Sequence, residues 1–271
     1  MSSKLDKNAE QSTNKHSFSG IMNLFSNRHP LLRLEQQRQT LLEQSTTQLP
    51  AHLKRLLMQP YPTPKQDCKE LSFTVVDFET SGLDPTSDHI VSIGWVHIIE
   101  GVIKLSTAQH FIINEPAIAS IIEDSDASDN IETTNIARSL HHILPEQQKE
   151  GIAIETAMQL FFESLPSSLV IAHGTTIEKR FLSQFFLSHN QVDFPLIWLD
   201  TLKIEQATVL NKRYQNDFRL SALRRDYKLP DYPAHNALMD ATATAELFLA
   251  QRRRLFGQAI EPVGILYQKS Q

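Results

Sequence analysis

Three acidic stretches that are far apart in the chain contain residue types suited to holding divalent metal ions. Asp77 and Glu79 end one apolar run, Glu178 stands a few residues beyond a second, and His235 and Asp240 open a late helical pattern. If the two apolar runs are neighbouring strands, four carboxylates and one imidazole come within reach of each other. Carboxylate oxygens bind Mg²⁺ and similar ions, and two such ions can together hydrolyse a phosphodiester. The spacing therefore indicates two-metal phosphodiester hydrolysis.

Each acidic stretch also has a simpler interpretation. Asp77 and Glu79 point to the same side of a strand end, where two carboxylates could be solvated. His235 could be a loop histidine in water, and Asp240 a first-turn acid stabilised by the helix dipole. Charges as close as those of Asp77 and Glu79 repel each other, and a divalent cation removes that repulsion. Because the stretches occur together and in this order, we favour a shared metal site.

The position of Glu178 in its predicted helix favours an inward orientation. Thr175 and Thr176 precede it, and either could cap the helix. Phe181 and Leu182 follow it at helical spacing, so Glu178 shares an apolar face with them. The alternative is a glutamate that faces water and is stabilised by the helix dipole, which explains the position but not the apolar neighbours.

The hydrophobic pattern predicts the strands and helices that would bring these stretches together. Apolar alternation predicts strands over residues 71–79, 89–99, 102–113, 169–172 and 196–199. Helical periodicity predicts helices over residues 31–48, 51–58, 154–161, 176–189, 201–210, 220–226 and 236–254. Three strands followed by alternating helices and strands fit an α/β fold, a ribonuclease-H-like mixed five-stranded sheet flanked by helices. The acidic stretch 123–132 is predicted to be an exposed loop.

The composition changes along the chain and indicates four segments. Residues 1–28 are rich in Ser, Asn, Lys and Gln and are predicted to be disordered. Residues 29–69 form an N-terminal helical extension that ends in a stiff, proline-rich linker. Residues 70–255 form the predicted main domain, and residues 256–271 a C-terminal tail.

The overall composition excludes several classes of protein. Of the 271 residues, 41% are apolar, and no apolar stretch approaches the roughly 20 residues that span a bilayer. The N-terminus lacks the apolar core of a secretory signal. A single cysteine, Cys68, excludes an intrachain disulfide, and the sequence has no Cys/His zinc cluster. We therefore expect a reduced, cytoplasmic protein with no membrane partner.

The net charge of −5 conceals an asymmetry between the two parts of the chain. Residues 1–70 carry ten basic and six acidic residues, a net charge of +4. Residues 71–271 carry sixteen basic and twenty-five acidic residues, a net charge of −9. Nucleic-acid-binding proteins are usually basic, so the acidic part argues against tight binding of long duplex. It fits an enzyme that grips a short strand end through bound cations.

These stretches resemble the motifs of a known enzyme family. Residues 77–85 read Asp-Phe-Glu-Thr-Ser-Gly-Leu-Asp-Pro and look like the first motif of the histidine-type DEDD (DEDDh) exonucleases, the group similar to the epsilon subunit of DNA polymerase III. His235, Ala237 and Asp240 match the family pattern His-x-Ala-x-x-Asp. Residues 200–202, Asp-Thr-Leu, and residues 93–94, Ile-Gly, resemble further family features. The resemblance covers about residues 71–250 and leaves residues 1–70 outside it.

The middle motif departs from the family pattern. The family usually has His-Asn-Ala-x-Phe-Asp, whereas residues 173–178 read His-Gly-Thr-Thr-Ile-Glu. Glu178 therefore stands where the family has aspartate. Glutamate keeps the charge but adds a methylene, and Mg²⁺ is strict about the geometry of its ligands. The substitution bears on how the second metal ion would be held.

The resemblance implies a metal-dependent 3′→5′ exonuclease that releases nucleoside 5′-monophosphates from the 3′ ends of single-stranded nucleic acid, with DNA favoured over RNA. It implies that two Mg²⁺ or Mn²⁺ ions are held by Asp77, Glu79, Glu178 and Asp240. His235 would act as general base, and Asp77 would bridge the two ions. Substrate binding would fall to Thr80, Gly82, Leu83 and His173, with Leu83 as a wedge against the terminal base.

Two alternatives remain at this stage. In one, Glu178 marks a decayed site, and the chain is a catalytically impaired module that binds nucleic acid or docks a protein partner through residues 30–58. In the other, residues 31–58 self-associate and the protein is an oligomeric enzyme. The leucines of this segment need burial, and packing on the chain's own main domain is the simplest way to provide it.

Overall fold

A mixed five-stranded sheet forms the centre of the computed structural model, which describes residues 29–45, 49–114, 143, 145–189, 194–208 and 217–271. The strands are β1 (Phe73–Thr80), β2 (Ile90–Ile99), β3 (Val102–Ile112), β4 (Leu169–Ala172) and β5 (Ile197–Asp200). Their order is β3-β2-β1-β4-β5, with β1 antiparallel to β2 and parallel to β4. The predicted ribonuclease-H-like sheet is therefore confirmed.

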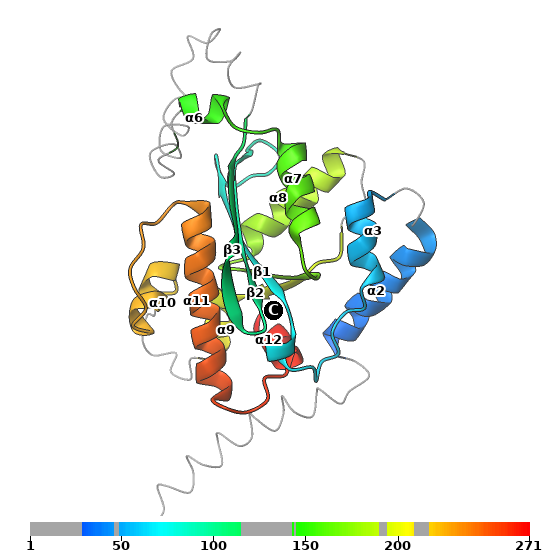
Figure 1. Ribbon diagram of the computed structural model, residues 1–271, viewed down its shortest axis with the longest axis vertical. Helices are drawn as coiled ribbons and strands as arrows, with labels where there is room; N and C mark the ends of the chain where they lie inside the picture. Colours follow the sequence, from blue (N-terminus) through cyan, green and yellow to red (C-terminus); the bar gives the residue numbers. More distant parts are fainter. Residues whose placement is uncertain (1–28, 46–48, 115–142, 144, 190–193, 209–216) are drawn as a thin grey trace, which may run out of the picture.

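Helices cover both faces of the sheet, because the central strands are apolar on both sides (Figure 1). The side chains of Val76 and Phe78 pack in one core with α7 (Ile154–Ser164) and α8 (Thr176–Ser188). Phe73 and Val75 point to the other face. That second core is completed by α9 (Thr201–Thr208), α11 (Ala237–Phe256) and α12 (Val263–Lys269). Three short helical elements lie outside these groups, namely η1 (Cys68–Glu70), α6 (Pro145–Lys149) and α10 (Leu220–Asp226).

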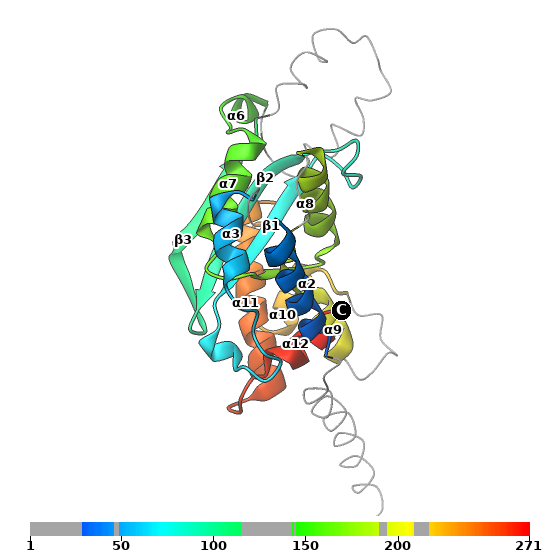
Figure 2. The same ribbon diagram turned by 90° about the vertical axis from the view of Figure 1, so that its right-hand side faces the viewer.

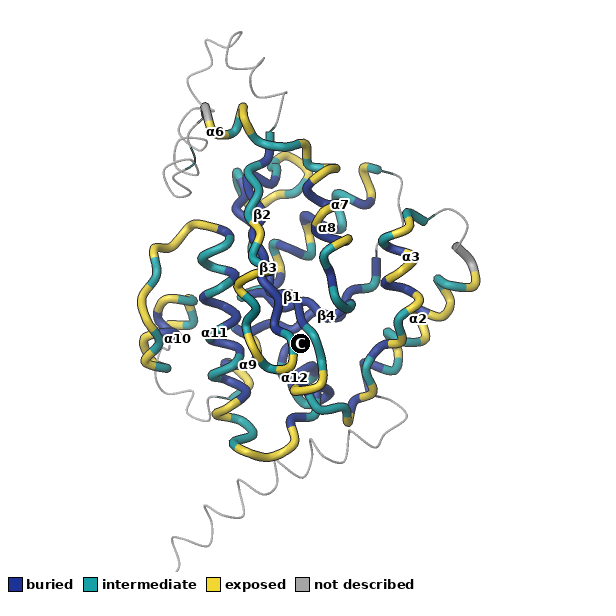
Figure 3. The backbone as a smooth tube through the Cα atoms, viewed as in Figure 1, coloured by how far each residue is buried: buried dark blue, intermediate teal, exposed yellow. Residues whose placement is uncertain are grey.

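The N-terminal extension is packed onto the rest of the chain. It forms α2 (Pro30–Ser45) and α3 (Ala51–Met58), which lie next to each other in both ribbon views (Figures 1 and 2). Leu53, Leu56 and Leu57 are at most 1% exposed and pack in the core that contains α7 and α8. Figure 3 shows the buried side of α3 turned towards the body of the protein. These leucines are buried within the chain, so their need for burial gives no support to self-association.

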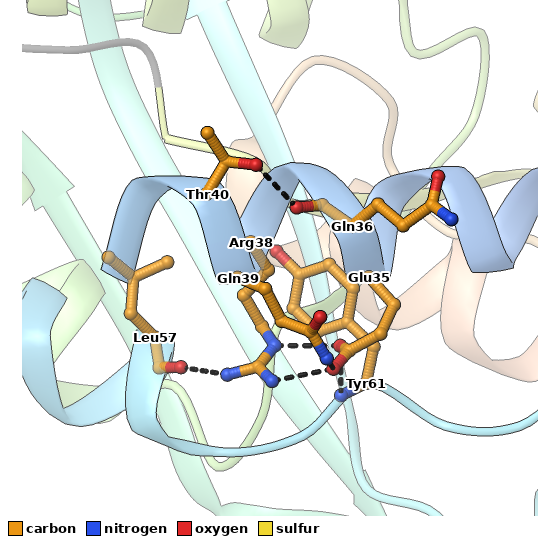
Figure 4. A network of polar contacts seen from close by, with 7 residues as sticks. All are labelled: Glu35, Gln36, Arg38, Gln39, Thr40, Leu57 and Tyr61. Atoms are coloured by element: carbon orange, nitrogen blue, oxygen red, sulfur yellow. Dashed lines mark hydrogen bonds and ion pairs between the residues drawn. The ribbon is translucent and has the colours of Figure 1, made fainter. Parts of the chain in front are cut away.

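A polar network joins α2 to α3 and to the segment that follows it (Figure 4). The Arg38 side chain is buried, donates two hydrogen bonds of 2.7 and 2.6 Å to Glu35, and donates a third to the carbonyl of Leu57. Glu35 also accepts a bond of 3.2 Å from the backbone N–H of Tyr61. Each buried polar group therefore has a partner, which fixes the relative position of the two helices.

The last residues of the chain also pack on the core. In the segment 256–271, set apart above as a tail, α12 buries Val263 and Leu266 completely. The ring of His29, just before α2, lies 3.2 Å from the carbonyl of Gly264. The N- and C-terminal segments thus contact each other and share one core with β1. The division of the chain into four segments stays a prediction.

Two predictions fall outside the described residues, namely the disorder of residues 1–28 and the exposed loop at 123–132. Within the part of the chain that is described, no helix combines the length and apolar character that crossing a membrane requires.

Candidate active site

Three carboxylates meet where β1 ends. Asp77 and Glu79 lie two residues apart on β1, and Asp240 lies in the first turn of α11. Each offers a carboxylate oxygen, and these oxygens all lie within 4.8 Å of one another. Because side chains alternate along a strand, Asp77 and Glu79 share the face that α11 covers. The sequence prediction that these three residues come together therefore agrees with the geometry.

The close approach of α11 depends on a glycine in β2. Gly94 is paired with Asp77 across the strands. A Cβ atom on Gly94 would lie 2.2 Å from the backbone nitrogen of Leu238 and 2.3 Å from the carbonyl carbon of Ala237. Ala237 and Ala241 are completely buried, which keeps this side of α11 narrow. A small helix face above a strand glycine lets Asp240 reach Asp77.

The start of α11 is fixed by its own side chains. Asn236 is the N-cap, and its side-chain oxygen accepts a bond of 3.1 Å from the backbone N–H of Met239. The backbone N–H of His235 donates to Asp240 Oδ2 at 2.9 Å. His235 has a φ of +68°, an unfavourable conformation for a residue with a side chain, so the surrounding contacts must hold it. These contacts place His235 directly beside the carboxylates.

The electrostatics of the cluster suit a divalent cation. Burial raises the pKa of Asp77 well above its usual value, and the charges of Glu178, Glu79 and Asp240 raise it further. Burial also raises the pKa of Asp240. Carboxylates in this state repel one another when ionised, and a bound divalent ion would stabilise all of them as anions. Clustered oxygen donors are what Mg²⁺ and Mn²⁺ prefer, so the residues fit the metal ions expected from the sequence.

Glu178 is buried beside the cluster and does not face water. It is 4% exposed, and burial raises the pKa of its carboxyl group. Its charge, like those of Glu79 and Asp240, raises the pKa of Asp77. Its Oε2 atom is buried without a hydrogen-bond partner. Glu178 is not one of the three residues whose oxygens lie within 4.8 Å, so its longer side chain holds a separate position.

Asp200 fixes the turn that leads into α8. Its carboxylate accepts bonds from the backbone N–H groups of Gly174 and Thr175, at 2.9 and 3.0 Å. The hydroxyl of Thr175 also donates to Asp200, at 3.2 Å. Thr175 is at the N-cap position, as the sequence suggested, but its side chain makes no capping bond to the helix. Asp200 therefore gives hydrogen-bond acceptors to the N–H groups that precede α8. These bonds fix the start of the helix that carries Glu178.

The His173 ring is held by two contacts within the protein. Its Nε2 lies 2.9 Å from the carbonyl of Phe218, so Nε2 carries the proton and donates. Its Nδ1 lies 2.8 Å from the hydroxyl of Thr201, which can donate to it. Burial lowers the pKa of His173, in agreement with a neutral ring. Both ring nitrogens are engaged within the protein, and substrate binding by His173 stays a prediction.

The turn after β1 carries the other predicted substrate-binding residues. The Thr80 hydroxyl donates to the carbonyl of Gly82 at 2.7 Å. Leu83 is 70% exposed in this turn, so its side chain is open to a ligand. Arg180, two residues after Glu178, donates to the Leu83 carbonyl at 3.0 Å. The turn and the start of α8 are thus directly linked.

Two polar residues behind Glu79 were not singled out from the sequence. Ser92 is paired with Glu79 across the strands, and His110 is paired with Gly94. Ser92 Oγ and His110 Nε2 are both buried without a hydrogen-bond partner. A polar residue in a buried, mostly apolar strand is the signal that could have drawn attention to Ser92. His110 gives no such signal, because β3 is largely polar and only partly buried.

Comparison with known proteins agrees with this site. Residues 74–248 match the RNase T family, described as exonuclease. The match covers well over half of the chain. The chain belongs to the RNase T family of exonucleases. The carboxylates Asp77, Glu79 and Asp240 lie inside the matched range, and the DEDD exonuclease resemblance found in the sequence is confirmed.

The chain is similar to parts of DNA polymerase III proteins. The chain is 28% identical over 194 residues to DNA polymerase III PolC-type from Thermotoga petrophila, and the match covers 72% of this chain but only 12% of that protein. It is 29% identical over 184 residues to DNA polymerase III subunit epsilon from Rickettsia conorii, covering 65% of this chain and 71% of that protein. The similarity to PolC is therefore confined to a small part of a much longer protein.

Solved structures of the family share the fold. The nuclease domain of 3′hExo, a DEDDh family member solved with rAMP, superposes with a TM-score of 0.53 at 14% sequence identity, covering 72% of this chain and 96% of that chain. The sheet order and the flanking helices described above thus belong to a known nuclease architecture.

Proposed function

We propose that this chain is a metal-dependent 3′→5′ exonuclease that releases nucleoside 5′-monophosphates from single-stranded 3′ ends. The observation that carries the proposal is the cluster of Asp77, Glu79 and Asp240 within 4.8 Å. Family membership supports the exonuclease reaction. The polymerase relatives favour DNA as substrate. The rAMP bound to 3′hExo makes RNA the alternative substrate.

Four carboxylates would hold two Mg²⁺ or Mn²⁺ ions, with Asp77 between the two positions. Glu79 and Asp240 lie close enough to Asp77 to share an ion with it. Glu178 has a buried oxygen without a hydrogen-bond partner, and this atom is available as a ligand. Bound divalent ions would lower the pKa of an attacking water and stabilise the leaving 3′ oxygen.

His235 would accept the proton of the attacking water. It is exposed, and its backbone N–H donates to Asp240, one of the three close carboxylates. An imidazole is the side chain that most often serves as a general base. The exposed Leu83 would contact the terminal base, while the Thr80–Gly82 turn would hold the terminal nucleotide.

A second function is favoured by one observation. Glu178 replaces the family aspartate and lies outside the group of three close carboxylates. If its oxygen does not reach the second ion, the chain would bind strand ends through one ion and hydrolyse them poorly. The two functions differ in the number of ions bound and in turnover.

Labelled oligonucleotides distinguish these functions. Single-stranded DNA and RNA of one sequence, labelled at the 5′ end, should yield a ladder of shortened products with Mg²⁺ or Mn²⁺, and the released product should be a 5′-monophosphate. Asp77→Asn is the matched inactive control, since it keeps the shape and removes one charge. Calorimetry should find two ions per chain. Binding without cleavage, with one ion per chain, would support the second function. Release of the 5′ label as a mononucleotide, without a ladder of shortened products, would contradict the first.

A further inference from the structure

Residues 229–236, the last part of the connection from α10 to α11, are mostly exposed and include His235. All of these residues except Leu229 and Tyr232 are exposed to solvent. Such a segment gains little order from apolar packing, so its conformation depends on specific polar contacts. One of these contacts, from His235 to Asp240, lies at its end. The others centre on Arg224 and Glu246.

Arg224 is a buried cation beneath this segment. Its side chain is 3% exposed. It donates a bond of 2.7 Å to the carbonyl of Ala243 in α11 and a bond of 2.6 Å to the carbonyl of Pro230 in the segment. Arg224 therefore attaches the beginning of the segment to the helix that carries Asp240.

Glu246 continues this attachment to Tyr232. One carboxylate oxygen of Glu246 accepts a bond of 2.7 Å from Arg224, and the other accepts a bond of 2.8 Å from the Tyr232 hydroxyl. The Arg224 guanidinium also lies over the Tyr232 ring, 4.5 Å from its centre. A charge-assisted pair with a stacked ring is a strong and directional contact. It fixes the middle of an otherwise exposed segment.

We propose that Arg224, Glu246 and Tyr232 are positioning residues for His235, with the Tyr232 hydroxyl as the contact that sets the histidine's place relative to the carboxylates. This inference rests on the proposed function, in which His235 takes a proton. None of the three would touch the reacting atoms. They would act by limiting the positions that the imidazole can adopt.

The chain between Tyr232 and His235 is short and stiff. Only Pro233 and Ala234 separate them, and Pro233 has a fixed φ. His235 itself is held at a positive φ by the bond from its N–H to Asp240. Anchors on both sides of so short a segment leave the imidazole little freedom. A general base must lie within hydrogen-bond reach of its proton, so loss of one anchor reduces the fraction of molecules in the productive arrangement.

Tyr232→Phe removes the anchor with the smallest change in shape. We expect kcat to fall by about tenfold, with KM and metal affinity unchanged, because a base out of place slows the chemical step and not binding. The effect should vanish in a His235→Ala background, since Tyr232 would then have no base to position. Hydrogen exchange at residues 234–236 should increase in Tyr232→Phe.

Tyr227→Phe is the matched control. The Tyr227 hydroxyl also donates to a glutamate, Glu205, at 2.8 Å, and an arginine, Arg254, lies over its ring. This second Tyr–Glu–Arg group lies outside the His235 segment. Its loss should leave kcat and the exchange of residues 234–236 unchanged.

Two outcomes would overturn the inference. An equal loss of kcat from Tyr232→Phe with and without His235 would show that Tyr232 acts on something else. Unchanged kcat together with unchanged exchange at residues 234–236 would show that the hydroxyl positions nothing. If the wild-type chain has no nuclease activity, the proposed function is wrong. Hydrogen exchange at residues 234–236 in Tyr232→Phe then still shows whether the Tyr232 hydroxyl orders the segment.

Discussion

Asp77 and Gly94 lie opposite each other on β1 and β2, and the missing side chain of Gly94 is what allows α11 to bring Asp240 to Asp77. The shortest distance from a Cβ at Gly94 to the helix backbone would be 2.2 Å. Backbone cannot move aside as a flexible side chain can. The geometry of the carboxylate cluster therefore depends on a residue that offers no ligand.

Gly94→Ala should move the start of α11 away from the sheet. Displacement of a ligand by about 1 Å can cost on the order of 10²-fold in rate, and overpacking costs about 1–3 kcal/mol of stability. We expect metal affinity and kcat/KM to fall together, measured by calorimetry and by the oligonucleotide assay. Gly101→Asn is the control, because Gly101 has open space around it and Asn tolerates a positive φ. Normal metal affinity in Gly94→Ala would contradict the argument.

His235→Ala should lower kcat by roughly 10²–10⁴, the range expected for loss of a general base. Metal binding should survive, because the contact from His235 to Asp240 is made by the backbone and the imidazole is not one of the proposed ligands. Calorimetry with Mn²⁺ checks this directly. Loss of an ion along with the ring would make the imidazole a ligand and assign the proton to another acceptor.

Glu178 provides a test of the departure from the family pattern. If its carboxylate holds an ion, Glu178→Gln should lower activity nearly as much as Asp77→Asn, since the amide keeps the shape and loses the charge. Glu178→Asp restores the family residue, and we expect higher turnover or a shift from Mn²⁺ towards Mg²⁺. Kinetics that stay the same in both variants would remove Glu178 from the site and leave three carboxylates to hold the ions.

The stability of the protein without metal should depend on the charge of Asp77. Its pKa is raised in the folded state, so between about pH 4 and that raised value the folded chain binds a proton that the unfolded chain releases. Stability from this group therefore falls as pH rises through that window. In EDTA, the melting temperature of Asp77→Asn should exceed that of wild type, by a margin that grows from pH 5 to pH 8.

The comparison with Asp77→Asn is needed because other groups titrate in the same range. Burial lowers the pKa values of His97 and His173, and these groups favour the folded state as pH rises. Asp84→Asn is a control of opposite sign, since hydrogen bonds from Thr86 lower the pKa of Asp84. Mn²⁺ should restore wild-type stability at pH 8. If the difference in melting temperature between Asp77→Asn and wild type did not change with pH, the proposed charge repulsion at Asp77 would be contradicted.

The strands of the sheet could be predicted from the sequence because each strand has its own apolar pattern. Alternation along residues 71–79 placed Asp77 and Glu79 on one side. The inward orientation of Glu178 was also anticipated, from Phe181 and Leu182, which proved to be buried with it.

Features that depend on distant partners could not be found this way. Whether His173 faces a ligand is decided by the carbonyl of Phe218, far along the chain. The leucines of α3 require burial, but nothing in their spacing names α7 as the partner. The contact of Tyr232 with Glu246 joins a segment without regular structure to the middle of a helix, and such pairs leave no periodic pattern.

The packing of α2, α3 and α12 has a practical consequence. The family match spans residues 74–248, yet the two cores are closed by leucines before that range and by Val263 and Leu266 after it. A fragment cut at the limits of sequence similarity would leave these core surfaces uncovered and prone to aggregation. The region of sequence similarity is therefore shorter than the unit that closes the two cores. A fragment made for expression should include α2, α3 and α12.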